Sequence, residues 1–333
     1  MDKRPILVIG AGSWGTALAL VLARNGNPTC LWDLSREHIS NLINDRCNNH
    51  HLPGFSFPDC LVPAAELDKL LEQVGDIVIA VPCENLQETL LQLQGLSKQS
   101  LRICLACKGL EPKTHSLNHL VVRQILGDVP VAVISGPSFA REVASGSPTA
   151  VVLASADPDT AGYFAERFHD TFFRIYTQDD IIGVQVGGAV KNVMAIAAGI
   201  ADGLGFGANS RAALITRGLV EITRLGVAMG ARQETFMGLA GLGDLVLTCT
   251  DDQSRNRRLG LILGRGGQVE AARREIGQAI EGIRTAEAVH KLAADYSIEM
   301  PISEQIYNVI HGQISPREAV QVLLSREQKS EFN

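Results

Sequence analysis

One lysine lies inside an otherwise apolar segment, and it is the residue with the clearest chemical potential in this chain. Lys191 belongs to residues 187–197, which read GGAVKNVMAIA. A buried ammonium is costly unless it is paired, and desolvation lowers the pKa of a lysine, which suits a group that gives and takes a proton. The alternative is a lysine whose charge reaches solvent past the apolar face. The many small neighbours favour a functional Lys191.

Two further segments could complete a site around that amine. Residues 238–244, GLAGLGD, end in Asp244 and have no strand pattern before them, so we interpret them as a tight loop that carries the carboxylate towards Lys191. Residues 254–258, SRNRR, combine Ser254, Arg255 and Asn256. A guanidinium fork matches phosphate oxygens, so this set could bind a phosphate. The alternative for SRNRR is an exposed cationic helix start.

A third segment has the spacing of a dinucleotide site. Residues 10–15, GAGSWG, follow the apolar run 6–9 and precede a helical pattern. In this context Gly10 would allow the tight turn, Gly12 would let the backbone approach a pyrophosphate, and Gly15 would let the helix pack on the sheet. The following helix N-terminus would hold the diphosphate. An ordinary glycine turn is the weaker alternative.

The elements that must position these groups change character near residue 180. Strand patterns at 6–9, 29–32, 77–81, 101–106, 129–134, 150–154 and 172–176 alternate with helical patterns at 16–25, 36–44, 64–72, 86–94 and 116–126. This alternation predicts an α/β fold with an N-terminal doubly wound Rossmann-type sheet. Helical patterns then dominate at 188–201, 212–229, 257–263, 269–276, 285–295, 303–310 and 317–324. We therefore predict a dinucleotide-binding domain at 1–180 and an all-helical substrate and catalytic domain at 181–333.

Polar groups follow several of the predicted strands. Lys108 comes after the strand at 101–106, and residues 135–140, SGPSFA, come after the strand at 129–134. Ligands of open parallel sheets bind beyond the carboxyl ends of the strands, so these groups should converge on the glycine-rich turn. Lys108 is favoured as an anion contact over a solvated lysine. For 135–140, a ligand-binding turn and simple helix capping are equally good interpretations.

Composition narrows the class of protein. A length of 333 residues favours two domains, and a net charge of −6 without a long basic run argues against a general nucleic-acid binder. The apolar stretch 181–206 is interrupted by Lys191 and Asp202, so we expect a buried helix and not a membrane span. Seven scattered cysteines and no signal peptide predict reduced thiols in the cytoplasm. Residues 47–63 have little periodicity and are expected to form a surface excursion.

Together these segments resemble the bacterial NAD(P)-dependent glycerol-3-phosphate dehydrogenases, over nearly the whole chain. The resemblance rests on matched motifs in order: GAGSWGTALA (10–19), KGLE (108–111), SGPSFA (135–140), GGAVKNV (187–193), DGLGFGAN (202–209), GLGDL (241–245) and SRNRR (254–258). It implies NAD(P)H-dependent, reversible reduction of dihydroxyacetone phosphate to sn-glycerol 3-phosphate, which supplies glycerophospholipid synthesis. No metal is required for that reaction.

The resemblance also implies roles for individual residues. Lys191 matches the proton acceptor for alcohol oxidation. The substrate contacts it implies are Lys108, Gly136, Ser138, Lys191, Asp244, Ser254, Arg255 and Asn256. The coenzyme contacts it implies are Ser13, Trp14, Lys108, Ala140, Arg255 and Glu281, which join Gly10, Gly12 and Gly15 of the glycine-rich turn.

Two positions give conflicting signals about the coenzyme. Asp33 lies about 20 residues past the glycines, where an acid bonds the ribose 2′-hydroxyl and disfavours NADP. Arg36 close by could accept a 2′-phosphate instead. We therefore include Asp33 and Arg36 in the coenzyme site and leave the choice between NADH and NADPH open. Cys83 and Cys107 stand where Ser and Thr are usual in the family, a small-residue exchange.

Two rival functions stay open from the sequence. One is a related β-hydroxyacid or 6-phosphogluconate-type dehydrogenase, which also joins a dinucleotide domain to a helical domain with a lysine. The segments 254–258 and 135–140 favour a glycerol-3-phosphate dehydrogenase over these related enzymes. The other is a non-catalytic nicotinamide-nucleotide sensor, which the presence of Lys191, Asn192 and Asp244 disfavours. A homodimer is implied by the resemblance alone.

Overall fold

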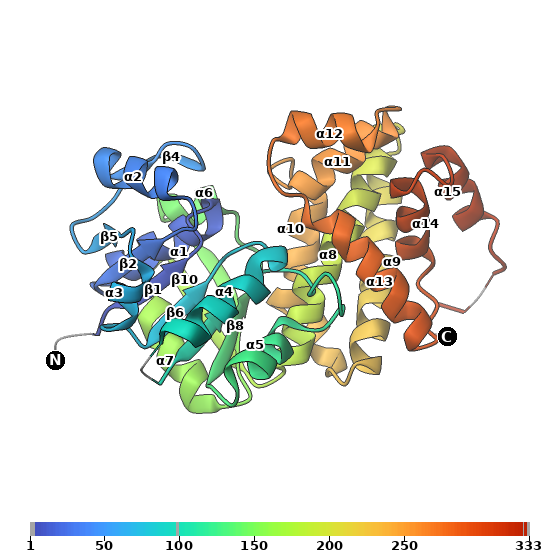
Figure 1. Ribbon diagram of the computed structural model, residues 1–333. Helices are drawn as coiled ribbons and strands as arrows, with labels where there is room; N and C mark the ends of the chain where they lie inside the picture. The colour runs from blue at the N-terminus through green and yellow to red at the C-terminus, as the bar shows by residue number, and fades with distance from the viewer. Residues whose placement is uncertain (1–3, 98–99, 329, 332–333) are drawn as a thin grey trace.

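The computed structural model describes residues 4–97, 100–328 and 330–331. Its first half forms an eight-stranded sheet in the order β10-β9-β8-β7-β6-β1-β2-β5 (Figure 1). Neighbouring strands are parallel except β8 and β9, which are antiparallel. The strands are β1 (Ile6–Ile9), β2 (Thr29–Trp32), β5 (Leu61–Pro63), β6 (Asp76–Ile79), β7 (Arg102–Leu105), β8 (Val131–Ser135), β9 (Thr149–Ala154) and β10 (Phe173–Gln178).

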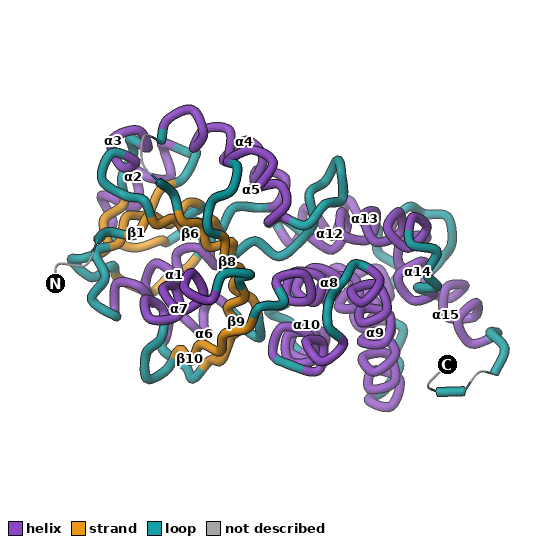
Figure 2. Tube along the Cα trace, turned by 90° about the horizontal axis from the view of Figure 1, so that it is seen from below, coloured by secondary structure: helices purple, strands orange, loops and turns teal. Residues whose placement is uncertain are grey.

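Helices cover both faces of this sheet, as the continuous apolar strands require. Alternate residues of β1 point to opposite layers: Val8 packs in one core with α1, and Leu7 packs in the other with α4. Figure 2 shows the strands between these two layers. The first layer contains α1 (Ser13–Arg24), α2 (Arg36–Asp45), α6 (Ala140–Ser145) and α7 (Pro158–Phe168), and the second contains α3 (Leu67–Leu71), α4 (Cys83–Leu96) and α5 (Asn118–Leu126).

The second half is helical and is built around α8 (Ile181–Gly203). Apolar side chains of α8 between Val186 and Ile200 lie in a third apolar core. Figure 1 shows α8 among the other helices of this half. The other elements are α9 (Ala208–Ala228), the 3₁₀ turn η1 (Gln233–Met237), the π turn η2 (Leu239–Gly243), α10 (Asp244–Thr250), α11 (Arg255–Gly264), α12 (Val269–Ile276), α13 (Glu281–Asp295), α14 (Pro301–Ile310) and α15 (Pro316–Leu324).

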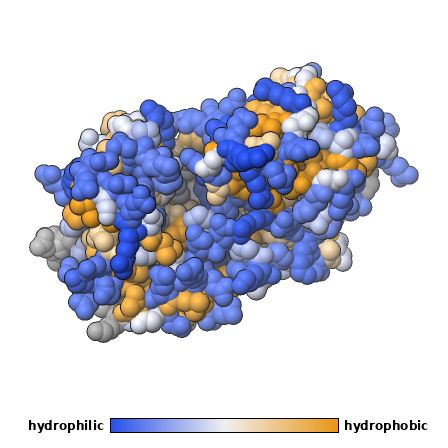
Figure 3. Space-filling model, turned by 45° about the horizontal axis from the view of Figure 1, so that its top comes forward, coloured by the Kyte–Doolittle hydropathy of each residue, from blue (hydrophilic) through white to orange (hydrophobic). Residues whose placement is uncertain are grey.

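Glycines let α8 and α11 pack with their backbones in contact. A Cβ on Gly199 would lie 2.1 Å from the carbonyl oxygen of Arg257, and a Cβ on Gly260 would lie 2.1 Å from that of Ile196. In the described residues, α8 is the one helix long and apolar enough to cross a membrane by length and composition, but 89% of that window is buried inside the protein. The face in Figure 3 is largely hydrophilic, with scattered hydrophobic patches. Helix α8 is therefore the core helix of the second half.

The predicted α/β fold with a helical second half is confirmed, and most errors lie at short elements. All seven predicted strands are present, within three residues at each end. The sequence analysis did not predict α7, α10 or the short helix α6. Cys104 and Cys107 lie in the cores on opposite faces of the sheet, and both are free thiols.

The expected surface excursion at 47–63 is wrong in part. It contains a hairpin of β3 (Cys47–Asn48) and β4 (Leu52–Ser56), and β5 pairs with β2 at the sheet edge. Asn48 is fully buried because its amide donates to the carbonyl oxygen of Ala11 and to Thr16 Oγ1, both at 2.8 Å. A buried amide of this kind leaves no periodic signal, so the sequence pattern could not reveal it.

Candidate active site

Lys191 lies buried between the two halves of the molecule and is paired with Asp244. Its side chain leaves the middle of α8, and Nζ donates to Asp244 Oδ1 at 2.5 Å. The exposed fraction is 7% for Lys191 and 1% for Asp244, so the lysine does not reach bulk solvent. Asp244 compensates the buried ammonium, which meets the condition for keeping a charge in the interior.

A second lysine uses the other oxygen of the same carboxylate. Lys108 Nζ donates to Asp244 Oδ2 at 2.8 Å and to the carbonyl oxygen of Gly136, also at 2.8 Å. Ser138 Oγ lies 3.5 Å from the same Nζ and donates to that carbonyl at 2.9 Å. Helix α6 has no side-chain hydrogen bond at its N-cap, so the capping interpretation of 135–140 is not supported. The carboxyl ends of β7 and β8 thus converge on Asp244.

Burial and the neighbouring charges bring the pKa of Lys191 towards neutral pH. Burial lowers its pKa to about 8. The carboxylate of Asp244 opposes that shift, and the nearby charge of Lys108 adds to it. An amine with such a pKa exists in both protonation states near neutral pH, so Lys191 can act as a general acid in one direction and a general base in the other.

The π turn η2 delivers Asp244 to the first position of α10. Gly187 on α8 makes room for it, since a Cβ there would lie 2.5 Å from the carbonyl oxygen of Ala240. Asp180 caps α8 through Gly183 N at 2.9 Å and also accepts from Thr235 Oγ1 at 2.6 Å, which fixes η1 against the start of α8. The predicted tight loop is therefore a π turn followed by a helix, a distortion often found at functional sites.

Thr248 is a member of the cluster that the sequence analysis missed. Its hydroxyl accepts from Lys191 Nζ at 3.0 Å and donates to the backbone carbonyl of Asp244 at 2.6 Å. Thr248 follows Asp244 by four residues, so a helix starting at Asp244 puts both on one face. The missing signal was α10 itself, because residues 244–250 were not predicted to be helical.

A chain of amide hydrogen bonds joins three elements beside Lys191. Asn192 Nδ2 donates to the carbonyl of Lys108 at 3.4 Å, and its Oδ1 accepts from Asn256 Nδ2 at 2.9 Å. Asn256 Oδ1 in turn accepts from the backbone N–H of Gly282 at 2.9 Å. Asn256 is thus already engaged at both ends, and one N–H of its amide is left for a ligand. This chain places the first turn of α11 next to the lysine.

The SRNRR segment separates into structural and ligand-facing groups. Ser254 is the N-cap of α11 and accepts from Arg257 N at 3.2 Å. Arg257 is buried and paired with Asp202 at 2.5 Å and Asp252 at 2.8 Å, so it holds helices together. Arg255 is exposed at the first position of α11, where the free N–H groups of the helix also favour an anion. The alternative interpretation of SRNRR as an exposed cationic helix start is therefore wrong for Arg257, which is buried, and describes only the position of Arg255.

The glycine-rich turn has one open position between two closed ones. Gly10 has φ +104°, and a Cβ there would lie 2.8 Å from the backbone of Ala80. A Cβ on Gly15 would lie 1.9 Å from the carbonyl oxygen of Gly10. A Cβ on Gly12 would meet nothing within 4 Å. This open space beside the start of α1 fits the approach of a pyrophosphate.

Three predicted coenzyme residues lie around that turn. Ser13 Oγ donates to the carbonyl of His51 at 2.7 Å, and Trp14 Nε1 donates to the carbonyl of Ala106 at 3.2 Å. Lys108 Nζ lies 5.9 Å from the centre of the Trp14 ring, which joins the glycine-rich turn to the Lys108–Asp244 cluster.

The remaining predicted coenzyme residues are spread along the crevice. Asp33 Oδ2 accepts from the N–H of Ala11 at 2.8 Å, whereas Arg36 is exposed at the start of α2. Ala140 begins α6. Glu281 begins α13, and burial raises the pKa of its carboxyl group while the charge of Arg255 opposes that shift. Glu281 and Arg255 therefore interact electrostatically, which joins the start of α13 to the start of α11.

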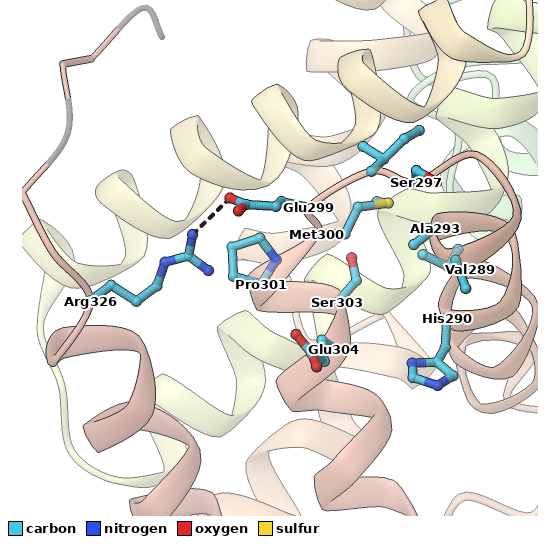
Figure 4. Close-up of a pocket in the computed structure, with 12 residues that line it drawn as sticks. Val289, His290, Ala293, Ser297, Glu299, Met300, Pro301, Ser303, Glu304 and Arg326 are labelled. Carbon is cyan, nitrogen blue, oxygen red and sulfur yellow. Dashed lines mark hydrogen bonds and ion pairs between the residues drawn. The ribbon is translucent and has the colours of Figure 1, made fainter.

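One hollow of the molecule lies away from these residues. It measures about 460 Å³ and lies between the end of α13, the start of α14 and Arg326 (Figure 4). Glu299 and Arg326 are paired across its edge at 3.1 Å. None of the residues predicted for catalysis or binding lines it. The arrangement of acid, base and anion contacts is thus found at the Lys191 cluster and not in this hollow.

Comparison with known proteins identifies the family. The family models for the N-terminus and the C-terminus of NAD-dependent glycerol-3-phosphate dehydrogenase match residues 5–161 and 180–321. This chain belongs to the NAD-dependent glycerol-3-phosphate dehydrogenase family. A glycerol-3-phosphate dehydrogenase [NAD(P)+] of Shewanella halifaxensis is 55% identical over 328 residues, which cover 98% of this chain and 97% of the relative.

Other members of the family agree in sequence and in structure. The Nitrosococcus oceani enzyme of the same name is 53% identical and covers 98% of this chain and 95% of its own length. The crystal structure of glycerol-3-phosphate dehydrogenase from Coxiella burnetii superimposes with a TM-score of 0.95 at 50% identity, covering 98% of this chain and all of that one. The predicted family, the NAD(P)-dependent oxidoreductase class and the Rossmann-type fold are confirmed. This assignment decides against a β-hydroxyacid or 6-phosphogluconate-type dehydrogenase and against a non-catalytic sensor.

Proposed function

We propose that this chain catalyses the reversible, NAD(P)H-dependent reduction of dihydroxyacetone phosphate to sn-glycerol 3-phosphate, as a supply step for glycerophospholipids. The observation that carries the proposal is the buried cluster in which Lys108 and Lys191 share the carboxylate of Asp244. A ketone reduction needs one proton donor at the carbonyl oxygen, and a phosphorylated substrate needs a cationic anchor a few ångströms away. The cluster and the start of α11 offer both.

Lys191 acts as the proton donor in the proposed reduction. Its ammonium polarises the carbonyl oxygen and then protonates the alkoxide that forms there. In the oxidation, neutral Lys191 removes the hydroxyl proton. Asp244 holds the amine in place, and Thr248 accepts a second hydrogen bond from it at 3.0 Å, which leaves the third N–H for the carbonyl oxygen. The pKa of about 8 allows both protonation states near neutral pH.

The phosphate is assigned to the first turn of α11. Arg255 is exposed there and carries a guanidinium fork that matches phosphate oxygens. Asn256 has one amide N–H beyond its bond to Asn192. Ser254 is the N-cap of α11, and the N-terminus of the helix adds its own attraction for an anion. The full set of proposed substrate contacts is Lys108, Gly136, Ser138, Lys191, Asp244, Ser254, Arg255 and Asn256.

The glycine-rich turn fits the coenzyme that the family uses. When bound, NAD(P)H supplies the hydride. The open space at Gly12 and the N-terminus of α1 suit the pyrophosphate, with Ser13 and Trp14 beside it. The other proposed coenzyme residues are Gly10, Gly15, Asp33, Arg36, Lys108, Ala140, Arg255 and Glu281.

The proposal also covers the domain boundary, the cellular location and the oligomeric state. We divide the chain into a coenzyme domain at 1–180 and a substrate domain at 181–333, because α8 begins at Ile181 and the sheet ends with β10. We place the protein in the cytoplasm, since all seven cysteines are free. A homodimer is proposed from the family resemblance alone.

One assay tests the proposal. Purified protein is mixed with NADH or NADPH, and loss of absorbance of the reduced nicotinamide is followed after adding dihydroxyacetone phosphate. We expect steady oxidation of at least one coenzyme, and no oxidation with the unphosphorylated ketone at the same concentration. Oxidation that is equally fast with the unphosphorylated ketone would contradict the phosphate site, and no oxidation with either coenzyme would contradict the activity.

A further inference from the structure

Three histidines meet above the glycine-rich turn, and nothing in the proposed reaction uses them. The ring centres of His50 and His51 are 4.4 Å apart, and those of His38 and His51 are 5.0 Å apart. His38 comes from α2, whereas His50 and His51 come from the β3–β4 hairpin. We call these three side chains the histidine cluster. In the part of the chain that the structure describes, no set of three His, Cys, Asp or Glu side chains is arranged to hold a metal ion.

The hairpin is fixed to the coenzyme turn by hydrogen bonds. Asn48 Nδ2 donates to the carbonyl of Ala11 at 2.8 Å, and Asn48 Oδ1 accepts from the N–H of His51 at 3.0 Å. Ser13 Oγ donates to the carbonyl of His51 at 2.7 Å. His38 Nε2 lies 3.1 Å from the carbonyl of Ala11. The cluster is therefore held in a set position over the turn.

The cluster lies between opposite charges. His51 interacts electrostatically with His50 in its own hairpin, His38 on α2, Asp33 after β2 and Arg255 on α11. Burial lowers the pKa of His51, and the charges of His50, His38 and Arg255 add to that shift while Asp33 opposes it. Near neutral pH the imidazole of His51 is therefore uncharged in the free protein, and a new negative charge beside it would favour its protonation.

We propose that the histidine cluster sets the preference between NADPH and NADH and makes that preference depend on pH. This inference rests on the proposed function. Asp33 stands at the position that bonds a ribose 2′-hydroxyl, so the 2′-phosphate of NADPH would lie near a carboxylate. Protonated imidazoles at the cluster offset that repulsion. Acidic conditions favour NADPH, and alkaline conditions favour NADH.

The two coenzymes differ only at this end, which makes the effect separable. A phosphate monoester carries about −1.5 to −2 charges near pH 7, and NADH has a neutral hydroxyl in the same place. Binding of NADPH therefore takes up protons at the cluster, and binding of NADH does not. The exposed Arg36 adds a positive charge at the same end.

The test measures dissociation constants of NADPH and NADH by quenching of tryptophan fluorescence, from pH 6.5 to 8.5. For the unmodified chain we expect the ratio of the NADPH constant to the NADH constant to rise about tenfold across this range, the effect of one pKa unit of proton linkage. In a His50→Gln, His51→Gln double variant this rise is lost, and the ratio stays level or falls slightly with pH because the 2′-phosphate gains charge. The matched control, His311→Gln, changes a histidine at the end of α14 and keeps the slope of the unmodified chain.

Two features keep the test decisive. The 2′-phosphate itself loses charge near pH 6, which weakens NADPH binding in acid and so opposes the expected trend, and this contribution is the same in all variants. Calorimetry in two buffers of different ionisation enthalpy counts the protons taken up with NADPH. If the double variant does not fold, His51→Gln alone is used, because the hydrogen bonds of His51 to Asn48 and Ser13 use its backbone atoms, and the slope should fall below that of the unmodified chain.

The outcomes separate this inference from the function on which it rests. A ratio that does not change with pH in the unmodified chain overturns the inference and leaves the dehydrogenase intact. An unchanged slope in the double variant does the same. Absence of binding by both coenzymes overturns the proposed function, and the inference falls with it.

Discussion

Different chemical groups form the two ends of the proposed crevice. At the coenzyme end, loops and helix starts present backbone groups, and the decisive position Gly12 has open space around it. At the substrate end, side chains from α8 and α10 are buried among apolar residues, and Asp244 is only 1% exposed. One end is shaped by backbone, and the other by a closed network of charges.

This difference has a consequence for how each end responds to change. A backbone site loses affinity gradually, because each residue contributes one contact among many. A buried charge network fails abruptly, because removing one partner leaves another charge unpaired in the interior. Substitutions at the two ends should therefore differ in the size of their effects.

Replacing Lys191 should give the largest loss. In Lys191→Ala we expect turnover to fall by about a hundredfold or more, because the general acid and base is gone. Asp244 keeps its 2.8 Å pair with Lys108, so the fold and the dissociation constant of the coenzyme should change little. Steady-state kinetics and coenzyme titration measure both quantities. Turnover close to that of the unmodified chain would show that Lys191 is not the proton donor.

Filling the seam between α8 and α11 should cost stability. A Cβ on Gly199 would lie 2.1 Å from the carbonyl of Arg257, so Gly199→Ala forces the helices apart, and we expect a loss of about 2 kcal/mol in the free energy of unfolding. The control is Gly162→Ala on α7, where a Cβ meets nothing within 4 Å, and a gain of up to about 1 kcal/mol is expected from helix propensity. Urea denaturation compares the two, and equal stabilities would refute the close packing.

The buried charge network also predicts a pH dependence with a definite sign. Neutral Lys191 is needed for oxidation of the alcohol, so its rate should rise about tenfold per pH unit below the pKa of about 8 and level off above it. The reduction needs the ammonium and should instead fall above that pH. Asp244 raises the pKa of Lys191, so Asp244→Asn should move both inflections to lower pH. Inflections that move to higher pH in this variant would contradict the pairing.

The coenzyme end should respond more mildly. A methyl group at Gly12 has room in the protein but occupies the space assigned to the pyrophosphate, so Gly12→Ala should weaken coenzyme binding about fivefold, or about 1 kcal/mol. Stability should not change, since a Cβ there meets nothing within 4 Å. Gly95→Ala on α4, which is equally open, is the control and should leave affinity unaltered. Fluorescence titration and urea denaturation report both effects. Unchanged affinity in Gly12→Ala would place the pyrophosphate elsewhere.

The smallest effect is expected at Asp33. In Asp33→Gly the dissociation constant of NADPH should fall relative to that of NADH, because a carboxylate next to the 2′-position is removed. The expected change in their ratio is a few-fold, since the carboxylate is already hydrogen-bonded to the N–H of Ala11 at 2.8 Å. A ratio that moves towards NADH would reverse the role assigned to Asp33.

The sequence by itself determined the fold class, the position of the glycine-rich turn and the choice of Lys191 as a functional lysine. These follow from local chemistry: continuous apolar strands must be covered on both faces, and an ammonium among small apolar residues needs a partner. The sequence also predicted that a tight glycine-rich loop carries Asp244 towards Lys191, and the structure shows the two paired.

Only the tertiary structure decided which groups share that acid. Lys108 and Asp244 are 136 residues apart, and their contact depends on β7, η2 and α8 meeting at one point. The buried Asn48 and the contact of His38 with the β3–β4 hairpin had no periodic signal, because each depends on a long-range hydrogen bond or ring contact and not on burial of an apolar face. Thr248 was missed because α10 was not predicted. Local pattern fixes what an element is, and the packing of elements decides which polar groups meet.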